Sequence, residues 1–251
     1  MCADNEDAFA RDYPRLHELR ALTADPDSYT AYFHREFAQS IKNPGRARAW
    51  SSREQDLQAL DGAAWEALKG KLRPHLIGLD KEGRGWQQLI EAMNEASAYR
   101  YLAQQLGCRD IHFVPETAEQ TPDLEASTDG GLVLCETKTI SESDDEIQAR
   151  VEGKGVYSSN RLSEQFLAKL SATIAGATHQ VNAYRAGEQA QRILFLVVNF
   201  DDALGEYAQE FYGQIDAHLA TLKQDCQLVF FNRYTRFTSA ITMKNAAIIN
   251  D

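Results

Sequence analysis

The chain has 251 residues, a net charge of −11, and shares of apolar (43%) and charged (25%) residues that are ordinary for a globular protein. Its longest aliphatic run, Ile193–Val198, is far too short to cross a bilayer, and the acidic N-terminus lacks the apolar core of a secretory signal. The four cysteines lie far apart and form no Cys/His cluster, which argues against a zinc site or a disulfide framework. We therefore expect a reduced, cytoplasmic protein without membrane contact.

The negative charge is concentrated in residues 86–251, which hold 23 acidic and 13 basic side chains, whereas residues 1–85 are close to neutral. A field of this sign repels nucleic acid at long range and counts against a non-specific DNA-binding protein. Carboxylates grouped around metal ions would also add to this negative charge, without opposing nucleic acid once the ions are bound. The charge alone therefore excludes little at a local site.

The N-terminal region is predicted to be helical. Helices are expected within residues 6–42, broken near 23–29, and again over 54–72. The glycine-containing stretch 78–86 is the best candidate boundary. It divides the chain into a helical region, 1–85, which would serve recognition, dimerisation or packing, and a second domain, 86–251.

The second domain is predicted to mix helices and strands. A helix over 86–107 precedes three strand-like runs, and an acidic loop over 141–161 follows them. The fold class is therefore α/β, a mixed sheet with helices packed on it. The expected strands are 111–116, 123–127, 132–140, 192–200, 227–234 and 237–243, and the expected later helices are 162–185 and 206–223.

Charged residues occupy two of these strands. Side chains alternate between faces, so Glu136 and Lys138 share one face of 132–140, and Asp123 and Glu125 share one face of the preceding strand. The sequence Thr-Asp-Gly-Gly at 128–131 indicates a hairpin. Two or three carboxylates and a lysine would then converge, at a cost in stability unless a cation such as Mg²⁺ or Mn²⁺ is bound. The alternative is a surface hairpin with a minor cross-strand charge pair.

The order of these residues and elements resembles the PD-(D/E)XK nuclease superfamily. Pro122-Asp123, a spacer of 12 residues and Glu136-x-Lys138 match its short motif, and the predicted elements follow its α-β-β-β-α-β core. The resemblance covers about residues 86–200 and implies a restriction-endonuclease-like fold. It also implies a metal-dependent endonuclease of a restriction or defence type that hydrolyses phosphodiester bonds, with DNA as the expected substrate. The alternatives are a non-cleaving binding or assembly module of the same fold and an RNA-directed nuclease.

Site residues are carried over from the resemblance position by position. Asp123 and Glu136 would bind Mg²⁺ or Mn²⁺ with the main-chain carbonyl of Thr137, and Lys138 would position the attacking water. Glu125 is an alternative ligand or a solvated charge. The family often adds an acidic residue from the helix before the first strand and a glutamine from the helix after the third. Here these correspond to Glu95 and Gln180.

A basic run is the best candidate for further contact with nucleic acid. Residues 37–53 contain no acidic side chain, and Trp50 lies among its basic residues, so this run could grip a phosphate backbone or stack a base. The alternative is a solvated loop with one buried tryptophan. A homodimer would suit a palindromic target, although the sequence contains no identifiable dimer seam. The basic residues of the run are Lys42, Arg46, Arg48 and Arg53.

Overall fold

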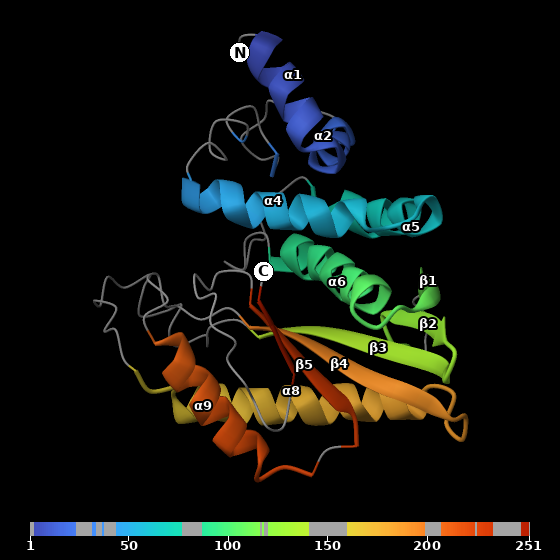
Figure 1. Cartoon of the computed structure of the whole chain (residues 1–251), viewed down its shortest axis with the longest axis vertical. Coiled ribbons are helices and arrows are strands. Elements are labelled where there is room, and N and C mark those ends of the chain that lie inside the picture. Colours follow the sequence, from blue (N-terminus) through green and yellow to red (C-terminus); the bar gives the residue numbers. More distant parts are fainter. Residues whose placement is uncertain are drawn as a thin grey trace. The chain divides into compact units, whose positions relative to one another are not determined.

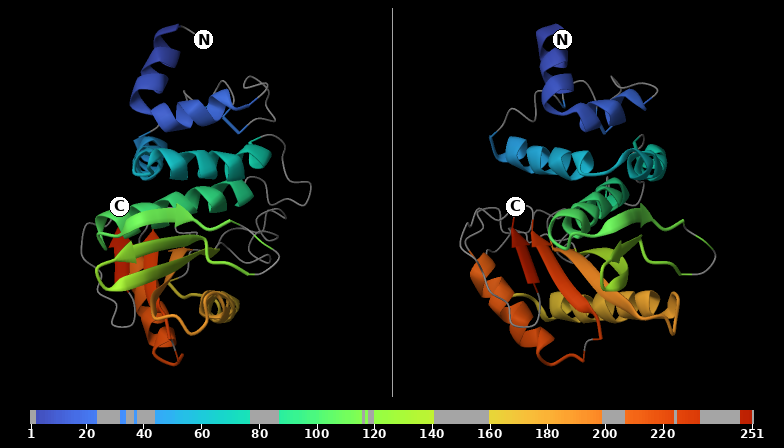
Figure 2. Two further views of the ribbon diagram at one scale, coloured as in Figure 1. Left: turned by 90° about the vertical axis from the view of Figure 1, so that its right-hand side faces the viewer. Right: turned by 45° about the vertical axis from the view of Figure 1, so that its right-hand side comes forward.

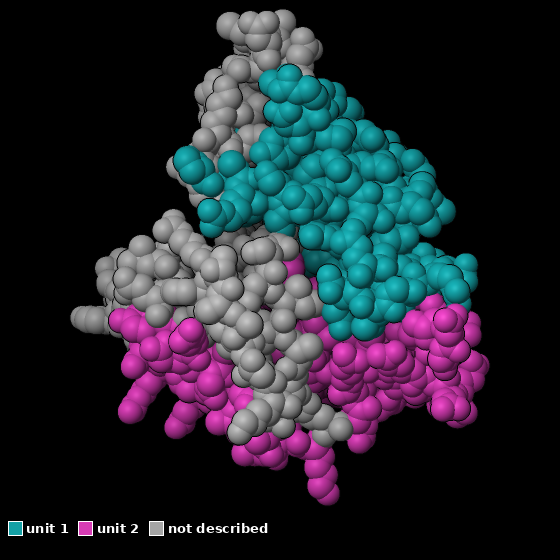
Figure 3. All heavy atoms as spheres, in the orientation of Figure 1, with its two compact units in different colours: residues 1–113 teal, residues 114–251 magenta. Residues whose placement is uncertain are grey.

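The structure is a computed structural model of the whole chain (Figures 1 and 2). It divides into two compact units, residues 1–113 and 114–251 (Figure 3), which are described separately below. The description covers all residues except 1–2, 24–31, 34–36, 38–43, 77–86, 116, 118–119, 141–159, 199–206, 224, 233–246 and 251.

The first unit is mostly helical, as the sequence predicts. Trp65, Leu68 and Leu72 turn one side of a helix into its core, where Leu16 and Leu19 are also fully or almost fully buried. Its elements are α1 (Ala3–Asp12), α2 (Pro14–Ala21), α4 (Pro44–Gln58), α5 (Gly62–Leu72), the short 3₁₀ helix η1 (Arg73–His75), α6 (Gln87–Gln104) and strand β1 (Arg109–Phe113).

The helix predicted over 54–72 is two helices. The Asp61 carboxylate accepts a hydrogen bond from the Ala64 N–H at 2.8 Å, which is the pattern of an N-cap and begins a new helix, α5. The earlier helix, α4, starts at Pro44, ten residues before the predicted start. A proline is well tolerated at this first helical position, so it marks the beginning of the helix rather than a break. Part of the basic run is therefore helical rather than a loop.

Helix α4 supplies a buried carboxylate that caps α2. Glu54 is only 3% exposed, and its two oxygens accept the N–H groups of Arg15 and Leu16 at 2.9 and 3.0 Å. These N–H groups lie in the first turn of α2, where a helix has no partners of its own for them. The negative charge also complements the positive end of the α2 dipole.

The second unit is an α/β structure with a mixed sheet. Among its described strands, β2 pairs with β3 in antiparallel fashion, whereas β3–β4, β4–β5 and β5–β6 are parallel pairs. Helices α8 (Glu164–Ala183) and α9 (Ala208–Leu219) lie against one face of this sheet (Figure 1). The strands are β2 (Leu124–Thr128), β3 (Gly131–Ile140), β4 (Ala190–Val198), β5 (Gln227–Asn232) and β6 (Ala247–Asn250).

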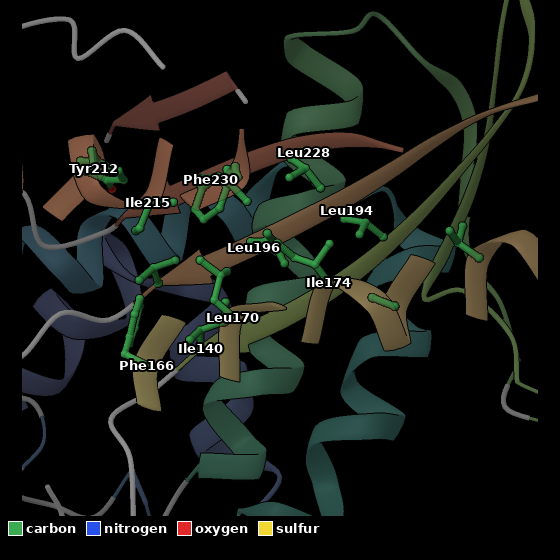
Figure 4. Close-up of a cluster of buried hydrophobic side chains, with 14 of the residues drawn as sticks. Ile140, Phe166, Leu170, Ile174, Leu194, Leu196, Tyr212, Ile215, Leu228 and Phe230 are labelled. Carbon is green, nitrogen blue, oxygen red and sulfur yellow. The ribbon is translucent and has the colours of Figure 1, made fainter. Parts of the chain in front are cut away.

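The core of this unit lies between the sheet and its two helices (Figure 4). On β3, Leu134 and Ile140 belong to it, so the face predicted by alternation for Glu136 and Lys138 is the face that α8 covers. Alternate residues of β4 also pack into this core. The residues between them are buried too, so the continuous apolar run of β4 is covered on both faces of the sheet. The cluster is completed by Phe166, Leu170, Ile174, Ala177, Val181, Tyr212, Ile215, Leu219, Leu228 and Phe230.

Most predicted elements are confirmed to within a few residues, and several predictions fall elsewhere. The hinge at 78–86, most of the acidic loop 141–161 and the strand at 237–243 lie outside the described residues. Strand β6 is not among the predicted strands. Within the described part of the chain, no helix is long and apolar enough to span a bilayer.

Candidate functional site

The β2–β3 hairpin brings the predicted acidic residues together. Its register pairs Leu124 with Cys135, so Asp123, one residue before β2, comes opposite Glu136. The predicted turn is confirmed, and Gly131 supplies a positive φ of 116° that other residues rarely adopt. Because opposite residues of an antiparallel pair project to the same face, the two carboxyl groups share one face of the sheet.

Asp123 is held by main-chain hydrogen bonds. Its Oδ2 accepts the N–H of Thr137 at 2.7 Å, and its own carbonyl accepts the N–H of Val114 at 3.0 Å. The preceding Pro122 is buried and fixes the backbone dihedral φ just before Asp123. The carboxylate is therefore tied to the strand that carries Glu136 and has little freedom to turn away.

Glu136 is a buried acid with one oxygen left without a partner. Its side chain is 1% exposed, Oε1 lies 2.6 Å from the Lys138 Nζ, and Oε2 has no hydrogen-bond partner among the described residues. Burial, and then the charge of Asp123, raise the pKa of Glu136 to about 8, against the opposing effect of Lys138. A buried carboxylate in this state is costly to ionise, and a cation would remove that cost.

Lys138 lies on the same face, two residues along β3. Its side chain is 38% exposed, in contrast to the almost fully buried Glu136 with which it forms an ion pair. The Lys138 side chain is therefore partly exposed to solvent, while the contact with Glu136 holds its ammonium group beside that buried acid. Such a position allows it to meet a water molecule or an anionic substrate at the site.

Gln180 contacts the segment that leads into Asp123. It lies on α8, and its Nε2 donates a hydrogen bond to the main-chain carbonyl of Thr121 at 2.7 Å. Thr121 is two residues before Asp123, so this bond ties the helix to the start of β2. The contact places Gln180 next to the predicted site in a supporting position.

Glu125 contacts two residues at the end of α8. Its Oε1 forms an ion pair with Arg185 Nη2 at 3.2 Å, and its Oε2 accepts a hydrogen bond from the Tyr184 hydroxyl at 3.4 Å. Its side chain is 12% exposed, which is at odds with the predicted solvated charge. Tyr184 and Arg185 are absent from the predicted site residues, because no sequence pattern indicates which strand residue the end of a helix will meet.

Glu95 belongs to the first unit, on α6. Its Oε2 accepts a hydrogen bond from Lys71 Nζ at 2.8 Å, and its side chain is 12% exposed. The hairpin belongs to the second unit, and the predicted contribution of Glu95 to its site stays a prediction.

The basic run is only partly a surface. Arg48 is exposed, but Arg53 is 5% exposed, donates to Asn94 Oδ1 at 3.4 Å and lies over the Trp50 ring at 5.8 Å. The prediction of Arg53 as a nucleic-acid contact needs correction, because the extended α4 turns this side chain into the helical packing. Lys42 and the side chain of Arg46 lie outside the described residues.

The chemistry of the hairpin site fits a hard divalent cation. Asp123 and Glu136 offer carboxylate oxygens on one face, and burial together with the charge of Asp123 raises the pKa of Glu136. Among the described residues, no group of three or more His, Cys, Asp or Glu side chains is arranged as a metal cage. Mg²⁺ typically binds through one or two carboxylates and keeps several waters, so the two acids match its needs.

No family model matches the chain, and comparison with curated proteins and with solved structures gives no match either.

Proposed function

We propose that the chain is a metal-dependent nuclease of the PD-(D/E)XK type, with a restriction-endonuclease-like core within residues 86–251, that hydrolyses phosphodiester bonds in DNA. The order of its elements along the chain, with a hairpin and then a helix and a parallel strand, supports this fold. The reaction is hydrolysis to a 5′-phosphate and a 3′-hydroxyl, as the resemblance to this superfamily implies.

One observation carries the proposal: Glu136 is buried with an unpartnered oxygen directly opposite Asp123, and Lys138 contacts its other oxygen. A solvated surface hairpin would leave these charges in water and their pKa values near normal. Here the protein instead holds Glu136 buried beside Asp123, in a place that raises the pKa of Glu136. Sites that bind cations and perform acid–base chemistry are where such arrangements concentrate.

Each of the site residues has a defined part in the proposed reaction. Asp123, Glu136 and the main-chain carbonyl of Thr137 would hold the divalent cation, Mg²⁺ or Mn²⁺. When bound, such a cation polarises the phosphodiester and lowers the pKa of a bound water. The Lys138 ammonium orients the attacking water and stabilises negative charge near the phosphate. Gln180 keeps the chain before Asp123 in place through Thr121.

The test is a cleavage assay with matched variants. Wild-type protein is incubated with supercoiled plasmid, linear duplex, single-stranded DNA and RNA, each with Mg²⁺, Mn²⁺ or EDTA. We expect metal-dependent cleavage of DNA that falls by about 100-fold or more in Lys138→Met and Asp123→Asn, because both contact or orient reacting groups. Asp129→Asn is the control, since it makes the same chemical change at an exposed position in the same hairpin.

The substrate panel also separates the alternatives. Cleavage of RNA in preference to every DNA would replace the DNA assignment by an RNA-directed nuclease. A folded protein that binds metal but cleaves none of the four substrates would overturn the nuclease proposal. It would favour a non-cleaving binding module, which the strongly acidic composition of residues 86–251 also suits.

A further inference from the structure

The end of α8 places a positively charged side chain beside the proposed site. Arg185 contacts Glu125, which lies two residues after Asp123 on the same face of the hairpin. Successive strand residues rise about 3.3 Å, so the Cα atoms of these two acids are about 6.6 Å apart. The Arg185 guanidinium is therefore anchored next to the residues that would hold the metal, on the hairpin-turn side of them.

The backbone at Arg185 is unusual. Its φ is 48°, in the left-handed region, and it follows Tyr184, the extended C-cap residue of α8. Helices often end with a residue in this conformation, and glycine is strongly preferred there because it has no Cβ to clash. The chain has glycine at other positive-φ positions, Gly107 and Gly187 among them, but uses arginine here. The side chain must therefore offset the disadvantage of the backbone.

Stability alone does not explain this arginine. A cation suits the negative end of a helix, and the ion pair with Glu125 joins α8 to β2. However, Arg185 is 41% exposed, and ion pairs that reach solvent contribute little to stability. A lysine would satisfy the helix end equally well. The planar guanidinium with its several N–H donors is the feature that these structural roles do not require.

The contacts of Arg185 leave it able to bind an anion. Nη2 lies 3.2 Å from Glu125 and Nη1 lies 3.6 Å from Glu188, so two acids orient a guanidinium that carries five N–H donors. The Tyr184 hydroxyl donates to the other oxygen of Glu125, and the Arg185 guanidinium lies 5.7 Å from the centre of the Tyr184 ring. A guanidinium held in one orientation and partly exposed is well suited to bind two oxygens of one phosphate group.

We propose that Arg185 binds a backbone phosphate of the nucleic-acid substrate, next to the phosphodiester that is cleaved. Glu125 and Tyr184 are then positioning residues, and Glu125 is not a metal ligand. This inference rests on the proposed nuclease function for the identity of the substrate. It assigns the part of that site that recognises the strand, separate from the acids that bind metal.

The test compares Arg185→Gly, Arg185→Lys and Lys169→Gln. Glycine removes the side chain and suits the positive φ, so folding is expected to be preserved. Lys169→Gln removes one positive charge from the exposed side of the same helix, 16 residues away or about 24 Å along it. Cleavage kinetics are measured with Mg²⁺, and binding of the same oligonucleotides is measured with Ca²⁺ by fluorescence anisotropy at several salt concentrations.

We expect Arg185→Gly to raise KM and weaken binding by about 5- to 20-fold, with a smaller change in kcat, and to reduce the salt dependence by about one phosphate contact. Arg185→Lys is intermediate, because it keeps the charge and loses the planar guanidinium, and Lys169→Gln stays within about 2-fold of wild type. Metal-induced thermal stabilisation is unchanged in all three variants, which a disturbed metal site would not allow.

The inference is overturned if Arg185→Gly cleaves and binds as wild type does, or if Lys169→Gln is impaired to the same degree. It is also overturned if the wild-type protein binds no nucleic acid. If wild type binds but does not cleave, and Arg185→Gly loses affinity, the nuclease proposal fails and the phosphate contact stands. The two proposals can therefore fail independently.

Discussion

Asp123 faces Glu136 across the β2–β3 hairpin, and the Thr137 N–H that binds Asp123 belongs to the residue next to Glu136. One strand thus supplies both the second acid and the group that fixes the first. The two acids cannot separate without breaking the pairing of β2 with β3, so the folded protein keeps their carboxyl groups close despite the repulsion between them. Lys138 offsets only part of it, because the pKa of Glu136 still stands near 8.

Replacing Glu136 with glutamine is expected to stabilise the protein at pH 8. The substitution keeps the shape and removes a buried charge, while it gives up the ion pair with Lys138. We expect the free energy of unfolding to rise by about 1–3 kcal/mol, from urea titrations in EDTA. Asp129→Asn, in the exposed turn, should change it by less than about 0.5 kcal/mol. A loss of stability in Glu136→Gln would show that the charge is compensated in the free protein.

The same acid predicts how stability depends on pH. Folding raises the pKa of Glu136 from 4.5 to about 8, so the folded state holds a proton that the unfolded state releases between these values. The contribution of Glu136 to stability is fully present below about pH 4.5 and is lost as pH rises toward 8, by up to about 1.4 kcal/mol per pH unit. Subtracting the Glu136→Gln curve from the wild-type curve isolates this effect from other titrating groups. A flat difference between pH 5 and pH 8 would contradict it.

Divalent cations should reverse this loss. Mg²⁺ or Mn²⁺ binds the ionised carboxylates, and a ligand that binds only the folded state raises its stability. We therefore expect the increase in melting temperature on adding Mn²⁺, relative to EDTA, to be larger at pH 8 than at pH 6. In Glu136→Gln the increase should be mostly lost at both pH values. An equal increase in wild type and Glu136→Gln would place the bound ion elsewhere on the protein.

Gln180 offers a test of positioning as distinct from stability. Gln180→Glu keeps the size of the side chain, but an ionised carboxylate cannot donate to the Thr121 carbonyl. We expect kcat to fall by about 10-fold and a higher Mn²⁺ concentration to be needed for half-maximal rate, because Asp123 is less firmly held. Gln165→Glu, at an exposed position of α8, is the control and should keep both values. Loss of stability with unchanged metal dependence would make Gln180 only a structural contact.

The sequence predicts the hairpin well because the relevant rules are local. The period of two on 132–140 and the turn at 128–131 together fix which side chains share a face, and the structure confirms both. The burial of Glu136 is not local, because it depends on α8 and β4 packing around it. A strand pattern cannot distinguish a charge in water from one under a helix.

The residues that sequence reasoning missed depend on contacts between distant elements. Arg185 lies 60 residues after Glu125, and only the placement of α8 against β2 brings them together. Arg53 is buried because α4 begins at Pro44, so the helix rather than the basic composition decides where this side chain points. Charge patterns in a sequence identify candidate surfaces, and helix boundaries then decide which residues reach them.

Glu54 provides a stability prediction for the first unit. Glu54→Ala would leave the part-buried N–H of Arg15 and the buried N–H of Leu16 without their acceptors at the start of α2. Removing the acceptor of a buried donor and a helix cap together is expected to lower the free energy of unfolding by about 2–4 kcal/mol. Glu54→Gln should cost less, because its amide oxygen still accepts one of the two bonds. Glu66→Ala, at a side chain that is 72% exposed, is the control, and urea titration followed by circular dichroism measures all three. If Glu54→Ala unfolds at the same urea concentration as Glu66→Ala, the capping contact does not stabilise this unit.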